Sequence, residues 1–386
     1  MKNIRDPLYG YIETSEAEQN IIDSPEMQRL RRIRQVGLSN LVYPAATHTR
    51  FQHSLGVMHL AGKFADSLNL NEERKKELRI AGLMHDSGHG PFSHASEIVA
   101  EQKGLSHEEL SCRTVRKLED KIPVDTERVE KIIHGELEIG QAVAGEIDAD
   151  RMDYLERDSY FTGVDHGNID AETIIKVAEI DSRRLVFDHK AVQALEGLLT
   201  ARFHMMKSVY THHASQIAEK MLQRSLQNYL KQGADVEQMM ALDDYEAHNE
   251  LLNSEGAAKN LYSRIKDRRL YKRSLVWDID NLSRKKLSEL EKKVDSRELE
   301  EKIAEEAGIR PEKVIIDKPW TPEIQDLKIR IKKNGKVKNM KEMSPIPEAL
   351  TKAEWRLVNM GVYTPQENTK NVCKIAEKII RDNYEL

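Results

Sequence analysis

Hydrophobic residues recur at helical spacing through most of the first 265 residues of the chain. Between residues 25 and 37, Met27, Leu30 and Ile33 lie three residues apart, Pro25 suits a first helical turn and Gly37 suits a stop. This pattern predicts a helix that runs from Pro25 to the neighbourhood of Gly37.

Two further amphipathic helices are predicted on either side of residue 70. The stretch 53–68 carries one apolar stripe that includes Leu55 and Leu68. The stretch 71–86 begins at a favourable N-cap, Asn71, and becomes wholly apolar as it approaches its end. We therefore expect its last turn to enter the core.

Residues 190–232 favour one or two long helices, and the pattern changes after about residue 265. The residues expected to face inward on the long helices are Leu195, Leu198, Leu199, Arg202 and Met206. Farther on, 313–319 and 327–338 read as strands, the latter folded into a hairpin at Asn334-Gly335. The charged stretch 283–308 favours a helix with a solvated face.

These elements together predict a mainly α protein. We expect a helical body over residues 1–265 and a smaller α+β extension over residues 266–386, regulatory or oligomerising in role. The boundary rests only on the change in pattern near residue 265.

Composition narrows the class of protein. The 386 residues are 39% hydrophobic and 32% charged, as in a globular protein, with a net charge of −5 that argues against a nucleic-acid partner. Apolar runs are too short for a membrane span, and two distant cysteines suggest no disulfide framework. We therefore expect a cytoplasmic protein.

Candidate chemistry centres on "AGLMHDSGHGPFSH", residues 81–94. Adjacent His85 and Asp86 at a helix end place an imidazole nitrogen and a carboxylate in one small volume, which suits Mn, Fe, Zn or Ni, or Mg with added waters. An isolated pair would more simply be a capped helix end beside an arginine. The glycines and proline that follow predict a tight turn, which would bring His89 and His94 back towards the pair.

Further ligand types flank this stretch. Upstream, "THTRFQHSLG" supplies His48 and His53. Downstream, "EIDADRMDYLERD" supplies Asp148, Asp150, Asp153 and Asp158. One histidine, the His-Asp pair and one of these aspartates would form a four-ligand set with open positions for water and substrate. Spacing alone does not choose Asp150 over Asp148 or Asp153.

The order H…HD…D, together with "IRDPLYGYIE", "IIDSPEMQRLRRIRQVG", "YPAATHTRFQHSLGV", "LSHEE", "IDADRMDYLERD" and "ARFHMMKSVYTHH", resembles the HD-domain metal-dependent phosphohydrolases. Within them the chain is most similar to the deoxynucleoside triphosphate (dNTP) triphosphohydrolases, the group that includes the vertebrate enzyme with an added SAM domain. The resemblance covers about the first 265 residues and implies an HD-domain helical bundle. It also implies that the metal ligands are His53, His85, Asp86 and Asp150.

The resemblance implies a reaction in which water attacks the α-phosphorus of a dNTP and releases deoxynucleoside and triphosphate. On this basis His94 would give a proton to the leaving 5′-oxygen and Glu97 would orient it. His107 and His89 would contact phosphate or assist proton transfer. His48 has no matching role in the family.

Substrate-binding positions follow from the same resemblance. Phosphate contacts would come from Arg50, Arg151 and Arg202, although the family has a lysine where Arg151 stands. The sugar would be held by Gln35, Tyr154, Asp158 and Tyr210: Gln35 and Asp158 bond the 3′-hydroxyl, Tyr154 packs on the ring and Tyr210 excludes a ribose hydroxyl.

Related vertebrate-type enzymes are tetramers that a guanine nucleotide activates between subunits. The matching positions here are Lys2, Asp23, Gln28 and Arg31, so the resemblance implies GTP or dGTP as activator and a homo-oligomer, a dimer or tetramer. Thr173 and His213 stand where a second, deoxynucleotide-binding site has arginine and lysine, and Met206 replaces a pocket histidine. These departures put dNTP activation and base preference in doubt.

Two other functions remain open at this point. The chain could be an HD phosphohydrolase for another nucleotide, such as a ribonucleotide, a monophosphate or a signalling nucleotide. It could also be a non-catalytic nucleotide sensor that keeps its metal for stability.

Overall fold

The computed structural model describes residues 2–279, 282–319 and 328–384. Contacts divide the chain into two compact units, the first formed by 1–210, 234–249 and 327–347. The second unit comprises 211–233, 250–326 and 348–386. Residue 265 lies inside the second unit, and the expected domain boundary there stays a prediction.

The first unit is built mainly from helices, which confirms the expected mainly α class with small sheets. Its elements are β1 (Lys2–Asp6), β2 (Gly10–Thr14), α1 (Glu16–Ile22), α2 (Pro25–Arg29), α3 (Arg50–Ser67), α4 (Glu72–Met84), α5 (His94–Glu101), α6 (His107–Lys117), α7 (Thr126–Ile133), α8 (Ala149–Thr162), α9 (Ala171–Lys176), β3 (Ala178–Asp181), β4 (Arg184–Asp188), α10 (Val192–Met205), α12 (Val236–Ala241), β7 (Arg330–Lys333) and β8 (Lys336–Asn339). Within the described ranges, we find no helix with both the length and the apolar character that crossing a membrane requires.

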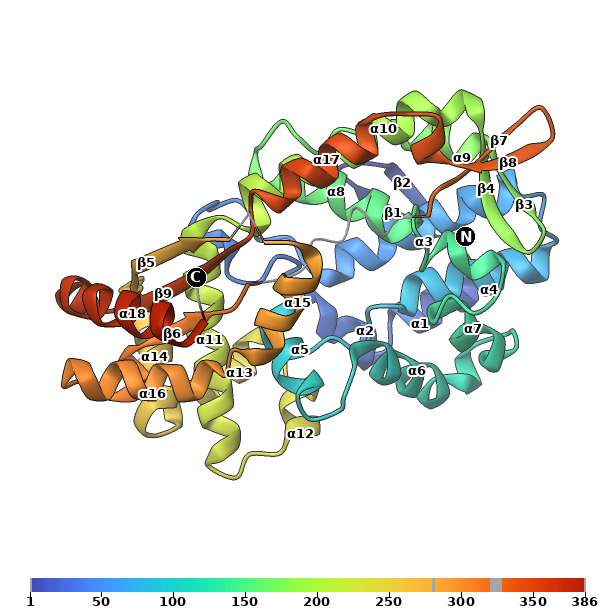
Figure 1. Ribbon diagram of the computed structural model, residues 1–386. Helices are drawn as coiled ribbons and strands as arrows, with labels where there is room; N and C mark the ends of the chain where they lie inside the picture. The colour runs from blue at the N-terminus through green and yellow to red at the C-terminus, as the bar shows by residue number, and fades with distance from the viewer. Residues whose placement is uncertain (1, 280–281, 320–327, 385–386) are drawn as a thin grey trace. The chain divides into compact units, whose positions relative to one another are not determined.

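Helix α3 packs against both α4 and α8, and the predicted metal ligands lie on α3, on α8 and directly after α4 (Figure 1). The predicted helices over 53–68 and 71–86 correspond to α3 and α4. Asn71 caps α4 as expected, because its side chain accepts the backbone N–H of Arg74. The last turn of α4 is buried, so the residues that follow it start inside the core.

The helix expected over 25–37 is shorter than predicted. Helix α2 ends at Arg29 and a 3-10 turn ends at Arg32, after which Ile33 is extended. The next residues pair with the start of α3, since Arg50 N–H donates to Ile33 O at 3.0 Å. Ile33 is fully buried in this extended segment, so its apolar spacing reflected core packing and not a longer helix.

Residues 190–232 form two helices joined by a wider π-helical turn over Met206–Tyr210. These are α10 and, in the second unit, α11 (His213–Lys231). The expected inward residues of α10 are buried, but Met206 is only half-buried. Met205, the last residue of α10, is buried instead, and Met206 begins the π turn.

The predicted hairpin is confirmed as β7 and β8, with Asn334 and Gly335 both in left-handed conformation at φ 51° and 74°. It joins a four-stranded sheet of order β3-β4-β7-β8, in which β4 and β7 are parallel (Figure 1). Lys332 bonds Glu179 and Asp181 at 2.7 and 3.0 Å. The hairpin therefore belongs by its contacts to the first unit.

The second unit contains a three-stranded sheet of order β5-β9-β6 with helices around it. Its elements are α11, α14 (Gly256–Lys266), β5 (Lys272–Asp278), α15 (Arg284–Lys293), α16 (Ser296–Ala307), β6 (Ile315–Asp317), β9 (Asn359–Thr364) and α18 (Thr369–Tyr384), while α13 (Asp244–Asn253) and α17 (Ile346–Trp355) cross the division between units. Helices α15 and α16 cover the stretch expected to be solvated. They also contribute Leu287 and Ile303 to the core, so only part of their surface is exposed.

Candidate metal centre and surrounding site

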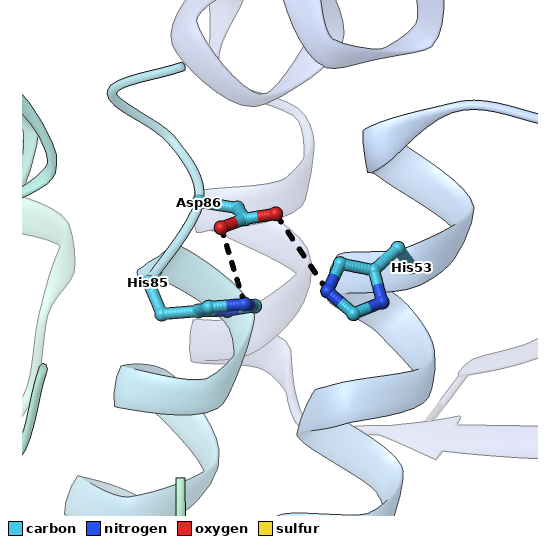
Figure 2. Close-up of side chains that lie close together, drawn as sticks. All are labelled: His53, His85 and Asp86. Atoms are coloured by element: carbon cyan, nitrogen blue, oxygen red, sulfur yellow. Dashed lines mark ion pairs between the residues drawn. The ribbon is translucent and has the colours of Figure 1, made fainter. Parts of the chain in front are cut away.

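His85 and Asp86 lie where α4 ends, and the backbone orients both side chains inward. His85 Nδ1 donates to Gly82 O at 2.8 Å, one turn back along the helix. This bond directs the other ring nitrogen, Nε2, towards Asp86 and His53 (Figure 2). The helix end itself therefore sets the orientation of the imidazole.

The Asp86 carboxylate lies at the centre of the cluster. Its Oδ1 is 3.3 Å from His85 Nε2 and 3.4 Å from His89 Nε2, and its Oδ2 is 3.6 Å from His53 Nε2. Oδ2 also accepts a hydrogen bond from the Arg50 guanidinium. Burial raises the pKa of Asp86, but the neighbouring histidines and Arg50 outweigh it and hold the pKa well below its usual range.

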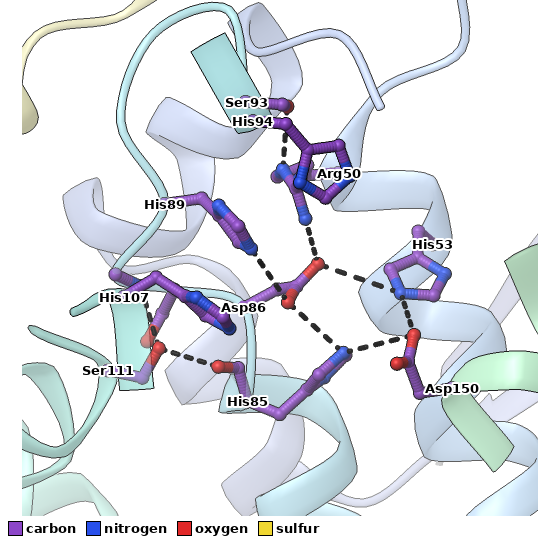
Figure 3. A network of polar contacts seen from close by, with 12 residues as sticks. Arg50, His53, His85, Asp86, His89, Ser93, His94, His107, Ser111 and Asp150 are labelled. Atoms are coloured by element: carbon purple, nitrogen blue, oxygen red, sulfur yellow. Dashed lines mark hydrogen bonds and ion pairs between the residues drawn. The ribbon is translucent and has the colours of Figure 1, made fainter. Parts of the chain in front are cut away.

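His53, on α3, faces carboxylates with both ring nitrogens. Its Nδ1 lies 2.8 Å from Asp153 Oδ2. Its Nε2 lies 2.9 Å from Asp150 Oδ1 (Figure 3). Burial lowers the pKa of His53, but Asp150 and Asp153 raise it to about 10. The cluster thus favours a positive charge at this place.

The three candidate aspartates of α8 have different surroundings. Asp148 is the N-cap of α8 and accepts the backbone N–H groups of Gly145 and Arg151 at 2.8 and 2.7 Å. Asp153 is bound bidentately by an arginine. Asp150 Oδ1 instead faces the Nε2 atoms of His53 and His85, at 2.9 and 3.7 Å. The geometry therefore favours Asp150 as the fourth ligand.

The donor set fits a divalent metal. One ligand atom each from His53, His85 and Asp86 lies within 4.8 Å of the others. The two Nε2 atoms are buried, and neither meets the geometry of a hydrogen bond with any described residue. Two imidazoles and one or two carboxylates suit Mn, Fe, Zn or Ni, and Mg with added waters. Asp86, His89 and His107 form a second such group, which shares Asp86.

His89, His94 and His107 gather on the side of Asp86 away from Asp150 (Figure 3). The His89 and His107 rings stack at 4.0 Å and 16°. Glu97 accepts from His94 Nδ1 at 2.9 Å and also pairs with His107 Nδ1. The His94 side chain is 63% exposed, that of His107 20% and that of His89 only 3%, so His94 is the most accessible of the three to an incoming molecule.

The pKa values differ within this group. Burial, reinforced by Arg50 and His107, holds the pKa of His89 well below its usual range, so the ring is neutral. Burial also lowers the pKa of His107, but Glu97 outweighs it and raises that pKa. Burial raises the pKa of Glu97, and His107 and His94 lower it far more, so Glu97 stays ionised.

The turn that returns His89 and His94 is tightly held. A Cβ on Gly88 would lie 2.2 Å from His107 O, so only glycine lets the turn approach α6 this closely. Phe92 and Ser93 both have positive φ, 60° and 54°. Ser93 Oγ accepts from Arg50 Nε at 2.8 Å and donates to Arg34 O at 2.6 Å, which anchors the start of α5.

Arg29 is a site-supporting residue that the sequence did not reveal. Its guanidinium donates to Ser87 O and His89 O at 3.0 and 2.7 Å, and to Leu242 O and Met240 O at 2.8 and 3.3 Å. Arg29 therefore ties the turn after Asp86 to the end of α12. No local pattern points to this role, because its partners lie 58 to 213 residues away.

Three of the expected sugar-binding residues, Tyr210, Asp158 and Tyr154, lie together. Tyr210 OH donates to Asp158 Oδ2 at 2.6 Å, and the Tyr154 and Tyr210 rings are 6.3 Å apart. His48, for which the sequence suggested no role, lies 2.7 Å from Asp158 Oδ1 through Nε2. The His48 carbonyl also accepts the backbone N–H of Gln35 at 3.0 Å, so His48 links the two expected 3′-hydroxyl contacts.

The expected phosphate-binding arginines are buried or half-buried, and Arg50 lies nearest the metal ligands. Arg50 keeps Nη2 buried without a hydrogen bond among the described residues. Arg151 donates to Glu146 O from Nη1, and Arg202 is buried on α10. The structure thus places Arg50 at the cluster itself.

The four expected activator residues lie within the first 31 positions. Lys2 is exposed on β1, and Asp23 accepts from Gln19 at 2.9 Å as α1 ends. Arg31 Nε donates to Gln28 Oε1 at 2.8 Å. The Arg31 guanidinium also stacks 3.7 Å over the Phe51 ring, next to Arg50 in sequence.

Comparison with known proteins places these observations in a family. The HD domain matches residues 50–158, and the HD associated region matches residues 169–382. An uncharacterized protein of Methanocaldococcus jannaschii is 36% identical over 380 residues, which cover 96% of this chain and 81% of the relative. A phosphohydrolase structure from Bacteroides thetaiotaomicron has a TM-score of 0.77 and 29% identity, over 94% of this chain and 100% of that one.

A relative with a named activity is the deoxynucleoside triphosphate triphosphohydrolase SAMHD1 homolog of Dictyostelium discoideum, 34% identical over 248 residues. The match covers 57% of this chain and 48% of the relative, so the chain spans about half the length of that protein. The His-Asp cluster lies within the matched HD domain. The chain therefore belongs to the HD-domain family of phosphohydrolases and is related to the SAMHD1-type dNTP triphosphohydrolases.

Proposed function

We propose that the chain is a metal-dependent dNTP triphosphohydrolase that cleaves between the α-phosphorus and the 5′-oxygen. One observation carries the proposal: the His53–His85–Asp86–Asp150 cluster adjoins a carboxylate-bound, exposed histidine, His94. At such a site the bound metal would supply a cation, Arg50 a cationic side chain and His94 a proton to one phosphate ester. The relation to SAMHD1-type enzymes supports the same substrate class.

His53, His85, Asp86 and Asp150 would hold the ion, which is Mn, Fe, Mg, Zn or Ni. When bound, a divalent metal neutralises phosphate charge and lowers the pKa of a water molecule. The chain prepares this site by orienting the imidazoles. The Gly82 carbonyl fixes the His85 ring, which leaves Nε2 towards the ion.

His94 would donate the proton that the leaving group needs. A water oxygen forms a bond to the α-phosphorus, the bond from that phosphorus to the 5′-oxygen breaks, and the 5′-oxygen takes a proton from His94. The proton that the attacking water gives up then restores His94, so that no net proton is gained or lost by the protein. Glu97 holds the ring through Nδ1, which leaves Nε2 to carry that proton. The products are deoxynucleoside and intact triphosphate.

Phosphate charge would be met by Arg50, Arg151 and Arg202, with His89 and His107 contacting oxygens or relaying protons. Arg50 supports this role because its Nη2 has no described partner and its other nitrogens are fixed by Asp86 and Ser93.

Sugar recognition would rest on Gln35, Tyr154, Asp158 and Tyr210. Gln35 Oε1 is buried without a hydrogen bond to any residue that the structure describes. His48 contacts both Gln35 and Asp158: its carbonyl accepts the Gln35 backbone N–H, and its Nε2 lies 2.7 Å from Asp158 Oδ1. These acceptors suit a sugar 3′-hydroxyl. The Tyr210 ring, tethered to Asp158, would occupy the space that a 2′-hydroxyl needs.

Activation by GTP or dGTP through Lys2, Asp23, Gln28 and Arg31 forms part of the proposal, as do a homo-oligomer (dimer or tetramer) and a cytoplasmic location. The Gln28–Arg31 contact supports a shared surface for a guanine base. No nucleic acid or membrane partner is invoked.

Chromatography of products tests the proposal. Purified protein with Mn²⁺ or Mg²⁺ is incubated with each dNTP, with and without GTP, beside a His85→Ala/Asp86→Ala variant. We expect deoxynucleoside and triphosphate in equal amounts from the wild-type protein and neither from the variant. Nucleoside diphosphate with orthophosphate would contradict attack at the α-phosphorus.

A further inference from the structure

A buried network of charged side chains, formed by Asp6, Arg157 and Asp153, connects the N-terminal hairpin to His53. His53 Nδ1 lies 2.8 Å from Asp153 Oδ2, and Arg157 binds both Asp153 oxygens at 2.8 Å. Arg157 Nη1 then donates to Asp6 Oδ2 at 2.9 Å. Asp6 is the last residue of β1, and Arg157 lies 151 positions later on α8.

The three residues of this network and His53 are buried, and both oxygens of Asp6 and of Asp153 accept hydrogen bonds. His53, Asp153 and Arg157 have no exposed surface, and Asp6 is 3% exposed. The second oxygen of Asp6 accepts the backbone N–H groups of Leu8 and Tyr9 at 2.9 and 3.2 Å. The turn between β1 and β2 therefore fixes Asp6, and Asp6 in turn fixes Arg157.

The lack of a side chain at Gly56 makes room for the Asp153–Arg157 pair. A Cβ on Gly56, one turn after His53 on α3, would lie 1.8 Å from Asp153 Oδ1 and 2.6 Å from Arg157 Nη2. The pair thus occupies the space that a side chain would take. Buried ion pairs add little net stability compared with apolar packing, so stability alone is a weak reason for three buried charges here.

The position of this buried network beside His53 indicates a role at the metal centre. A carboxylate that accepts from one ring nitrogen of a ligand histidine fixes the ring and its tautomer, and leaves the other nitrogen free to bind. Asp153 holds Nδ1 in this way, while Nε2 faces Asp86 and Asp150.

We propose that Asp6, acting through Arg157 and Asp153, positions the His53 ring and so sets the metal affinity of the site. The β1–β2 hairpin is then a working part of the metal centre although it supplies no ligand. This inference rests on the proposed metal ligation by His53. Asp6, Arg157 and Asp153 are positioning residues, since none of them contacts substrate.

The test measures Mn²⁺ binding to the full chain by the electron paramagnetic resonance signal of free Mn²⁺, with the visible spectrum of bound Co²⁺ as a second readout. Asp6→Asn is the main variant because it keeps the shape and removes the charge. Arg157→Lys is the second, because lysine keeps the charge but loses the planar fork. Glu18→Gln is the matched control: Glu18 is equally buried and pairs with Arg79 at 2.6 Å, but contacts no metal ligand.

We expect about tenfold weaker Mn²⁺ binding and an altered Co²⁺ spectrum in both Asp6→Asn and Arg157→Lys. Glu18→Gln should lower the melting temperature and keep wild-type Mn²⁺ affinity. Wild-type affinity in a folded Asp6→Asn and Arg157→Lys pair would overturn the inference, as would an equal loss in Glu18→Gln. Absence of Mn²⁺ and Co²⁺ binding in the wild-type protein would instead contradict the metal site itself.

Discussion

His94 Nδ1 lies 2.9 Å from Glu97 Oε2, one turn along α5, and the ring otherwise stands open to solvent. The same carboxylate pairs with His107. Glu97 therefore fixes the exposed ring through one nitrogen and leaves the other to face an incoming ester.

The contact between His94 and Glu97 predicts different losses of kcat for substitutions at the two residues. His94→Gln removes the proton donor and should lower kcat by roughly 10²- to 10⁴-fold. Glu97→Gln keeps a hydrogen-bonding group but not the charge, so a smaller loss, about tenfold, is expected. Steady-state kinetics with one dNTP measures both, with Mn²⁺ affinity as the control that should stay unchanged. A His94→Gln variant with wild-type kcat would exclude His94 as the acid.

Substitution should distinguish the roles of Asp148 and Asp150 on α8. Asp150→Ala should abolish turnover and weaken Mn²⁺ binding, because its carboxylate faces both ligand histidines. Asp148→Ala should instead cost about 1 kcal/mol of unfolding free energy through loss of the N-cap, with Mn²⁺ retained. Urea unfolding and metal titration of the two variants measure this. Metal loss in Asp148→Ala alone would reverse the assignment.

Tyr210 should control the choice between deoxyribose and ribose. Its hydroxyl is tied to Asp158 at 2.6 Å, which holds the ring in place. Tyr210→Ala should raise the GTP to dGTP ratio of kcat/KM by about tenfold or more, because space opens for a 2′-hydroxyl. Tyr210→Phe, which keeps the ring, is the matched variant and should shift the ratio less. An unchanged ratio in Tyr210→Ala would place the sugar elsewhere.

Glu156 predicts a pH dependence of stability that is separate from catalysis. Burial, with Asp153 adding, raises the pKa of Glu156 to about 7, above the roughly 4.3 of an unfolded chain. Below the unfolded pKa, Glu156 is neutral in both states and its full contribution to the free energy of unfolding is present. This contribution is lost as the pH rises through the folded pKa.

Glu156→Gln stays neutral at every pH, so it should be more stable than wild type above pH ~7 by about 1 kcal/mol, a figure reduced for partial exposure. The two proteins should converge below pH ~4, where Glu156 is protonated in both the folded and the unfolded chain. Urea midpoints at both pH values provide the comparison. Parallel stability curves would show that Glu156 titrates as it does in the unfolded chain.

Local patterns anticipated the helices and the hairpin of the fold. Asn71 signalled the start of α4, and Asn334-Gly335 signalled the β7–β8 turn, because both depend on residues adjacent in the chain. The pairing of β7 with β4 was not foreseeable, because it joins segments about 144 residues apart (Phe187 with Ile331). The π turn at Met206 likewise has no simple periodic signal.

The candidate site divides in the same way. His53, His85 and Asp86 were predicted as metal ligands from the H…HD…D order that the chain shares with the family, and the structure brings them together. The supporting residues were not predicted: Arg29 acts on backbone carbonyls, and His48 reaches Asp158 110 positions away. Such roles depend on tertiary contacts, which a single sequence does not display.

Hydrolysis in oxygen-18 water tests the central claim most directly. If water attacks the α-phosphorus, one labelled oxygen enters the triphosphate and none enters the deoxynucleoside, as mass spectrometry of both products will show. Label in the deoxynucleoside would indicate attack at carbon, and label in orthophosphate would indicate attack at the γ-phosphorus. Either result would contradict the proposed reaction.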